Sequence, residues 1–302
     1  MRRSTCTDTH MTRRLRALVV CVATTGVLVG CTIPTDTDPG ETPTVEVTDN
    51  EAGPAPDGAA LTAQSQRFTD EFDAFAAGLP GQAAIAVVVP GPGGAPEVFA
   101  AGDPAAPVAW STIKVPLARA ALALDPGADA DARAAITVSD NPAAEALWAR
   151  FAGPGAAAEA VEQQIGGAGA PVPAVPTAST RDGFSIFGQT VWPLADQARY
   201  AAATVCPDHS DAVTQMMGEI SDDQSWGLGT VPGARFKGGW GPEPDGGYLA
   251  RQFGVVDTEV GPVAVALAAI GDGGDFATAT AITGRATDWL TDHPALLPGP
   301  SC

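Results

Sequence analysis

Residues 111–124, STIKVPLARAALAL, carry the pattern from which both the fold and a candidate site follow. The stretch predicts a helix, and Ser111 and Lys114 lie three residues apart at its start. Their side chains then share one face of the helix, about one turn apart. A serine hydroxyl is a poor nucleophile until a base takes its proton, and a lysine that burial or a second cation keeps neutral can be that base. The stretch therefore indicates a serine and lysine acyl-transfer site.

Two further motifs lie downstream, Ser139-Asp140-Asn141 and Lys237-Gly238-Gly239-Trp240. Lys114 and Lys237 are the only lysines of the chain. Taken singly, the three motifs are typical of a helix cap followed by a solvated lysine, of a capping turn and of a strand end. Their occurrence together, in this order and on the expected element types, favours a catalytic interpretation.

In this order the motifs resemble S-x-x-K, S-D-N and K-T-G of the serine β-lactamase and penicillin-binding protein superfamily. The stretches AAITVSDNPAA at 134–144 and QSWGLG at 224–229 are similar to class A β-lactamases in particular. The resemblance covers roughly residues 60–292 and implies a class A β-lactamase-like serine hydrolase.

The expected order of elements agrees with that fold. Because both ends of the folded part supply strands, we expect an α/β (α+β) fold with one five-stranded antiparallel sheet, flanked by helices, and an inserted all-helical lobe at about 125–222. The Ala-, Gly- and Pro-rich stretches 125–131 and 166–180 are expected to be loops. The expected helices are 60–79, 111–124, 142–151, 194–205, 211–220 and 276–290, and the expected strands are 84–89, 97–101, 233–240, 247–257 and 262–270.

The resemblance implies a role for each catalytic residue. Ser111 is the acylated nucleophile and Lys114 its general base, while Ser139 relays a proton to the leaving nitrogen. Lys237 supplies positive potential to Ser139 and to a substrate carboxylate, and Asn141 binds the substrate amide.

Substrate binding is expected along the strand that carries the third motif. The backbone N–H of Trp240, next to Gly239, is the expected second oxyanion donor. Arg251, on the following strand, is a candidate clamp for a substrate carboxylate, because its guanidinium offers a bidentate fork. A surface arginine on an edge strand is the alternative for Arg251.

The chain departs from class A β-lactamases at two points. Those enzymes use a glutamate in a loop beyond S-D-N to activate the deacylating water, and no glutamate occurs here between Glu162 and Glu219. Asp182, the only acidic residue in that loop, is expected to be a turn former. Gly238 stands where the family places Thr or Ser, so a hydroxyl for the substrate carboxylate is missing. Both differences predict poor β-lactam turnover.

The first 31 residues predict export. Arg13, Arg14 and Arg16 precede an apolar run that is too short to span a bilayer, as in a secretory signal. The run ends in Leu28-Val29-Gly30-Cys31, which resembles the lipobox of bacterial lipoproteins, here of actinobacterial type. Residues 1–30 are then the signal peptide and Cys31 the lipid anchor on the outer face of the cytoplasmic membrane. An ordinary signal peptide followed by a chance cysteine is the alternative.

Composition sets further expectations for the rest of the chain. Residues 31–60 are rich in Pro, Thr and acidic residues and predict a disordered tether to a domain at 61–302. The formal net charge of −19 becomes about −23 without the five arginines and one aspartate of the leader, which disfavours nucleic acid as a partner. Cys206 and Cys302 are the cysteines left to form a disulfide. No ligand spacing for a metal and no cofactor motif is found, and a monomer is expected.

Three functions remain open on the sequence alone. The first is a penicillin-binding or D-alanyl peptidase-like hydrolase that acts on a small-molecule or peptidoglycan-peptide-like substrate. The second is a catalytically lapsed binding lipoprotein, suggested by Gly238 and the absent loop glutamate. The third is a true class A-like β-lactamase.

Overall fold

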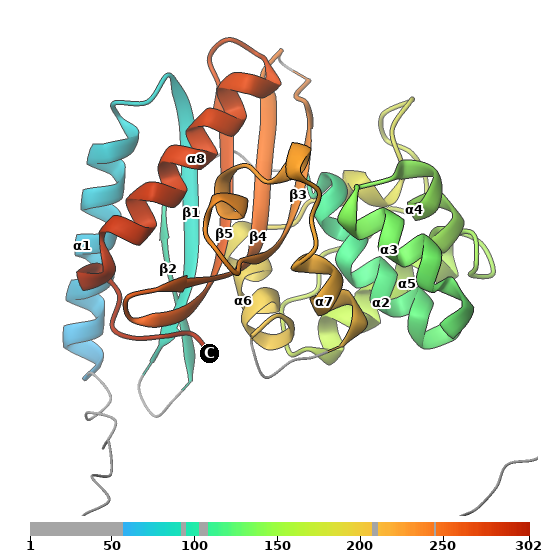
Figure 1. Ribbon diagram of the computed structural model, residues 1–302, viewed down its shortest axis with the longest axis horizontal. Coiled ribbons are helices and arrows are strands. Elements are labelled where there is room, and N and C mark those ends of the chain that lie inside the picture. The colour runs from blue at the N-terminus through green and yellow to red at the C-terminus, as the bar shows by residue number, and fades with distance from the viewer. Residues whose placement is uncertain (1–56, 92–94, 103–107, 207–210, 245) are drawn as a thin grey trace, which may run out of the picture. The chain divides into compact units, whose positions relative to one another are not determined.

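The computed structural model describes residues 57–91, 95–102, 108–206, 211–244 and 246–302 (Figure 1). The expected leader, Cys31 and the expected tether up to residue 56 lie outside these residues. The first helix, α1, covers Gly58–Ala76, and it begins there because the Asp57 carboxylate accepts a 2.7 Å hydrogen bond from the N–H of Ala60. Across the described ranges, no helix is both long and apolar enough to cross a membrane.

The expected sheet is confirmed: five antiparallel strands lie in the order β2-β1-β5-β4-β3. Strand β1 reads as a nearly continuous apolar run, which is typical of a strand covered on both faces. Strand β3, which carries the third motif, lies at one edge. The strands are β1 Gly81–Pro90, β2 Pro96–Ala101, β3 Arg235–Pro242, β4 Tyr248–Thr258 and β5 Gly261–Gly271.

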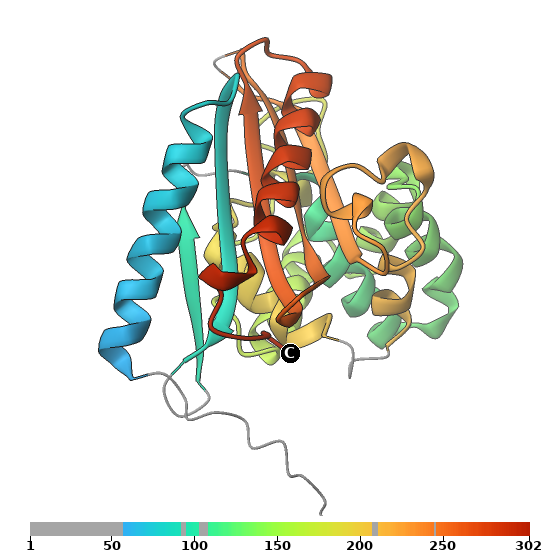
Figure 2. The same cartoon turned by 60° about the vertical axis from the view of Figure 1, so that its left-hand side comes forward.

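Each face of the sheet has its own core. Ile85 and Val87 of β1 pack with α1 and with α8, Phe276–Asp292, and Figure 2 shows these two helices on the same face. Ala86 and Val88 point the other way and pack with α6, Leu194–Thr204, and with the helical lobe. The period of two along β1 therefore separates the two layers.

The helical lobe places the first two motifs beside the sheet. The turn η2, Trp110–Ile113, leads into α2, Lys114–Leu124, so Pro116 falls in the first turn of α2, where a missing N–H costs no helical hydrogen bond. The other helices of this part are α3 Asp129–Thr137, α4 Asn141–Trp148, α5 Pro154–Gly167 and α7 Ala212–Met217.

Two parts of the lobe correct the sequence expectation. Residues 129–131, expected in a loop, form the first turn of α3. Helix α5 was not expected, and its last two residues, 166 and 167, belong to a stretch that was expected to be a loop. Both helices are rich in alanine, which has the highest helix propensity but gives little apolar periodicity. Apolar periodicity therefore does not predict α3 and α5.

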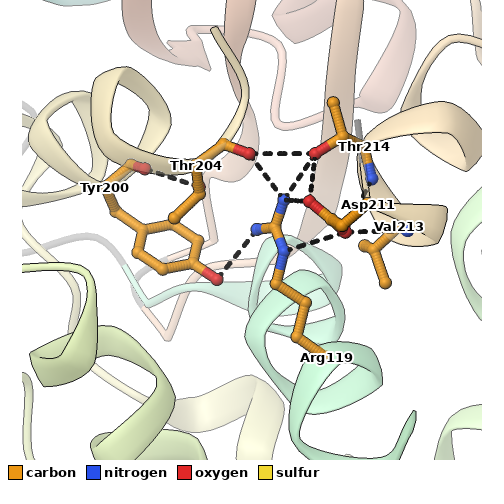
Figure 3. A network of polar contacts seen from close by, with 6 residues as sticks. All are labelled: Arg119, Tyr200, Thr204, Asp211, Val213 and Thr214. Carbon is orange, nitrogen blue, oxygen red and sulfur yellow. Dashed lines mark hydrogen bonds and ion pairs between the residues drawn. The ribbon is translucent and has the colours of Figure 1, made fainter. Parts of the chain in front are cut away.

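A buried arginine connects α2 to the helices beyond it (Figure 3). The guanidinium of Arg119 donates hydrogen bonds to the Tyr200 hydroxyl at 2.9 Å, to the Thr204 carbonyl at 2.8 Å and to the Thr214 hydroxyl at 2.8 Å. It also forms an ion pair with Asp211 at 3.1 Å. These contacts hold α2, which follows Ser111 in the chain, against α6 and α7.

A disulfide joins the end of α6 to the last residue of the chain. Cys206 and Cys302 are bonded, with their Cα atoms 5.4 Å apart, and the bond closes a sequence separation of 96 residues. The pairing left open by the sequence is therefore present, and it holds the C-terminal tail against the domain.

Candidate active site

Ser111 lies at the surface of a cleft, whereas Lys114 lies beneath it. The Ser111 side chain is partly exposed and lines a cleft of about 480 Å³, while Lys114, at the start of α2, is 1% exposed. The Ser111 hydroxyl makes no hydrogen bond with the described residues, so it remains available to a substrate.

Both lysines converge on Ser139. The Nζ atom of Lys237 donates a 3.0 Å hydrogen bond to the Ser139 hydroxyl, and the Nζ atom of Lys114 lies 3.4 Å from the same oxygen. Lys114 also donates to the Ser139 carbonyl at 2.6 Å and to the amide oxygen of Asn141 at 2.7 Å. The structure therefore brings the lysines of the first and third motifs to the second motif, as the sequence predicts.

Burial gives the two amines unusual acidity. Desolvation lowers the pKa of Lys114 to about 8, although Asp140 and Glu145 raise it. The pKa of Lys237 is lowered by its complete burial and, to a smaller extent, by the charge of Lys114. A substantial fraction of Lys114 is therefore neutral near pH 8, as a general base requires.

The backbone is strained at Trp110, directly before Ser111, and at Ser139. Among the described residues other than glycine, only Trp110 and Ser139 have positive φ, +48° and +55°. Trp110 directly precedes Ser111, and Ser139 accepts the hydrogen bond from Lys237. Strain of this kind persists where packing imposes a geometry, and it clusters at functional sites.

Strand β3 approaches Ser111 at Gly239. A Cβ atom at this position would lie 2.8 Å from the backbone nitrogen of Ser111 and 2.9 Å from that of Thr112. Glycine is required because only its bare backbone fits. The next residue, Trp240, lines the cleft, so its backbone is on the strand that borders Ser111, as expected for an oxyanion donor.

Gly238, where the resemblance implies a residue with a hydroxyl, lies against an aromatic ring of another segment. A Cβ atom on Gly238 would lie 3.2 Å from the Trp226 indole ring. Trp226 in turn makes an edge contact with the Trp240 ring, with centroids 6.2 Å apart. Aromatic surface therefore borders the strand at Gly238.

Arg251 corrects the sequence expectation. It is 0% exposed on β4, which is an inner strand, so it is neither a clamp in the cleft nor a surface residue of an edge strand. Its guanidinium donates to the backbone carbonyls of Val108 at 2.9 Å and Trp192 at 2.8 Å, and to the side chain of Gln197 at 2.6 Å. Arg251 is a structural residue that joins β4 to the segments beside the site.

Several lining residues were missed from the sequence. Glu145 lies four residues after Asn141 on α4, and this helical spacing would have placed it on the same side. The aromatic residues come from separate segments, and no local pattern groups them. The described lining residues are Trp110, Ser111, Ser139, Asn141, Glu145, Gly183, Phe184, Ser185, Trp240, Gly241, Pro242 and Tyr248.

Comparisons with solved structures point to one fold. A class A β-lactamase from Bacteroides cellulosilyticus is 15% identical, with a TM-score of 0.57 over 76% of this chain and 97% of the other. A β-lactamase from Streptosporangium roseum is 17% identical, with a TM-score of 0.55 over 77% and 100%. A β-lactamase from Chitinophaga pinensis is also 17% identical, with a TM-score of 0.56 over 76% and 98%.

Sequence comparisons alone find no relative. No family model matches the chain, and neither does any curated protein. The likeness is therefore one of fold, at identities below one fifth. This chain is accordingly a protein of serine β-lactamase-like fold.

Proposed function

We propose that this protein is an exported serine hydrolase of the cell envelope that forms an acyl-enzyme through Ser111. Its activity is penicillin-binding or D-alanyl peptidase-like, on an amide or ester of small-molecule or peptidoglycan-peptide type. One observation carries the proposal: the Ser139 hydroxyl lies between the amines of Lys114 and Lys237, in the cleft that Ser111 lines.

Acylation proceeds with the residues at hand. Neutral Lys114 takes the hydroxyl proton of Ser111, and Oγ bonds to the substrate carbonyl carbon. The developing oxyanion is stabilised by the backbone N–H groups of Ser111 and Trp240. As the C–N bond breaks, Ser139 gives its proton to the leaving nitrogen and regains one from Lys114, while Lys237 stabilises the charge.

We expect β-lactams to be turned over poorly. Neither Arg251 nor a hydroxyl at position 238 is available to a β-lactam carboxylate, because Arg251 is buried and Gly238 is covered by Trp226. The carboxylate of a penicillin or of a D-alanyl peptide therefore lacks two of the partners expected for it, which weakens its binding.

Covalent labelling tests the proposal. A fluorescent penicillin or a fluorophosphonate is expected to label the wild-type protein, and Ser111→Ala is expected to abolish the label. Ser65→Ala, on α1 and outside the cleft, is the matched control and is expected to label normally. Equal labelling of Ser111→Ala and wild type would end the assignment.

A lapsed enzyme that acts as a binding module is the second candidate. It is favoured by the hydrogen bonds of Lys114, which run to Ser139 and Asn141 while the Ser111 hydroxyl has no partner among the described residues. Saturable binding of a peptidoglycan fragment, unchanged in the Ser111→Ala, Lys114→Ala double variant, would support it. Loss of binding in that variant would argue against it.

We also propose that the chain is anchored by lipid at Cys31, on the basis of the lipobox-like LVGC at 28–31. Cys31→Ala is expected to move the protein from the membrane fraction to the soluble fraction and to prevent incorporation of a fatty-acid analogue. Cys21→Ala, within the same leader, is the control and should still be lipidated. Incorporation that continues in Cys31→Ala would contradict the anchor.

A further inference from the structure

The turn that carries Ser111 is contacted by a buried glutamine that the acylation chemistry does not use. Gln197 lies on α6 and is fully buried. Its side-chain nitrogen Nε2 donates a 2.8 Å hydrogen bond to the hydroxyl of Thr112, the residue that follows Ser111 in the chain. The described residues that line the cleft do not include Gln197, so it contacts the turn and not a substrate in the cleft.

The hydrogen bonds of Gln197 have a fixed direction. A guanidinium only donates, and that of Arg251 donates a 2.6 Å hydrogen bond to the side-chain oxygen Oε1 of Gln197. The amide nitrogen of Gln197 then faces Thr112, and since this nitrogen only donates, the Thr112 hydroxyl accepts. The hydroxyl proton is left for the carbonyl of Ala109, to which Thr112 donates. Through Gln197, Arg251 therefore determines where the Thr112 hydroxyl directs its proton.

The bond from Thr112 to Ala109 closes the turn around Ser111. These two residues flank Trp110 and Ser111 in the chain, and the backbone N–H of Thr112 donates to the same Ala109 carbonyl at 3.1 Å. Trp110 has a φ of +48°, a conformation that a residue with a side chain keeps only where its surroundings impose it. The two hydrogen bonds to the Ala109 oxygen help to impose it, and they fix the backbone from which the Ser111 side chain projects.

The segment that leads into this turn is held by the same arginine. Arg251 donates to the Val108 carbonyl at 2.9 Å, and the N–H of Ala109 donates to the Thr190 carbonyl at 2.6 Å. Strand β3 packs against the turn as well, because a Cβ atom on Gly239 would lie 2.9 Å from the Ala109 oxygen. The shape of the turn therefore depends on contacts from β3, β4 and α6, and the contact from α6 is the one made by Gln197.

We propose that Gln197 is a positioning residue for the acylation of Ser111. Oriented by Arg251, it keeps the Thr112 hydroxyl on the Ala109 carbonyl, and the turn keeps its shape. The proposal rests on the proposed function, since it concerns the rate at which Ser111 forms an acyl-enzyme. A residue that only stabilised the fold would change the amount of folded protein and not the rate constant of folded molecules. A positioning residue changes that rate constant, because a displacement of about 1 Å at the reacting group costs about 10²-fold.

Reversing one hydrogen bond tests the proposal. Gln197→Glu keeps an acceptor for Arg251, whose charge keeps the new carboxyl group ionised, but it offers Thr112 no donor. The Thr112 hydroxyl then donates to the carboxylate and leaves Ala109. Acylation by a fluorescent penicillin is followed over a range of concentrations, which gives the limiting rate constant and the half-saturating concentration. We expect the rate constant to fall about 10–10²-fold and the half-saturating concentration to stay unchanged.

A second pair of variants addresses the Thr112 hydroxyl itself. Thr112→Val removes the hydroxyl at nearly constant volume, and its limiting rate constant should fall as in Gln197→Glu. Thr112→Ser keeps a hydroxyl and is expected to restore most of the rate lost in Thr112→Val. Thermal unfolding of each variant shows that the molecules being labelled are folded.

Thr287→Val on α8 is the matched control. Thr287 is also a fully buried threonine whose hydroxyl donates one hydrogen bond, at 2.9 Å to the Thr283 carbonyl, but it lies on the opposite face of the sheet from α6. Thr287→Val should lose stability as Thr112→Val does and keep the wild-type rate constant.

Four results would contradict these assignments. A wild-type rate constant in folded Gln197→Glu or folded Thr112→Val would overturn the positioning role and leave the acyl-enzyme in place. An equally slow Thr287→Val would assign the loss to general stability and overturn it too. A raised half-saturating concentration at an unchanged rate constant would assign Gln197 to substrate binding instead. Absence of any adduct on the wild type would overturn the proposed function itself.

Discussion

Lys237 and Ser139 lie 98 residues apart in the sequence, yet the amine of the first donates a 3.0 Å hydrogen bond to the hydroxyl of the second. Lys237 comes from the edge strand β3, and Ser139 comes from the turn before α4. This contact joins the sheet to the helical lobe at the place where Lys114 also arrives. The proposed mechanism depends on this contact, since it places one hydroxyl within reach of two amines.

Acylation should depend on pH through Lys114. Its pKa of about 8 is below the ordinary lysine value, so the neutral form predominates only above that pH. Below pH 8 the neutral fraction, and with it the acylation rate, should fall about tenfold per pH unit. Initial rates of labelling across the range from acid to mildly alkaline buffer check this. A rate that stays constant on both sides of pH 8 would contradict the role of Lys114 as base.

Removing the Ser139 hydroxyl, which lies close to both lysine amines, should slow acylation without unfolding the protein. Ser139→Ala is expected to lower the labelling rate by about 10²–10³-fold, because the proton relay is lost. Ser139→Gly removes the same hydroxyl and relieves the positive φ, so it should be equally slow but slightly more stable than Ser139→Ala. Labelling rates and thermal unfolding of both variants check this. A normal rate in either one would remove Ser139 from the mechanism.

Adjacent glycines of β3 should respond differently to one added methyl group. Gly239→Ala would place Cβ 2.8 Å from the Ser111 nitrogen, so the nucleophile or the strand must shift, and we expect acylation to fall at least about 10²-fold. Gly238→Ala would meet only the Trp226 and Trp240 rings, at 3.2 Å or more, and should keep most of the rate. Labelling kinetics of the pair provide the comparison. Similar effects of the two substitutions would refute the close approach at Gly239.

Arg251 should matter for stability and not for recognition of a carboxylate. Arg251→Met removes the donors to two backbone carbonyls and to Gln197, so we expect the free energy of unfolding to fall by about 3 kcal/mol. Denaturant unfolding measures this loss. Among folded molecules of the variant, the preference for acidic over neutral substrates should match that of wild type. A variant of normal stability that binds carboxylate substrates selectively less well would show instead that Arg251 binds the substrate carboxylate.

The sequence predicts the fold and the candidate site by different means. The strands at both ends and the helices between them follow from local periodicity, and the sheet confirms them. The alanine-rich helices α3 and α5 did not follow from local periodicity, because alanine favours a helix without marking its buried face. The pair Ser111 and Lys114 was identified from helical spacing, and Ser139 and Lys237 from the resemblance of their motifs to a known superfamily. The structure brings the three motifs together.

What the sequence by itself determined was the order of the elements, because it depends on periodicity within each segment, and the three motifs that nominated the candidate site by resemblance. Only the tertiary structure decided what surrounds them. It buried Arg251 behind the site, set Trp226 against Gly238 and turned Glu145 toward the cleft. Each of these contacts depends on which distant segment packs at that place. Packing between distant segments produces no periodic pattern in the sequence of either segment.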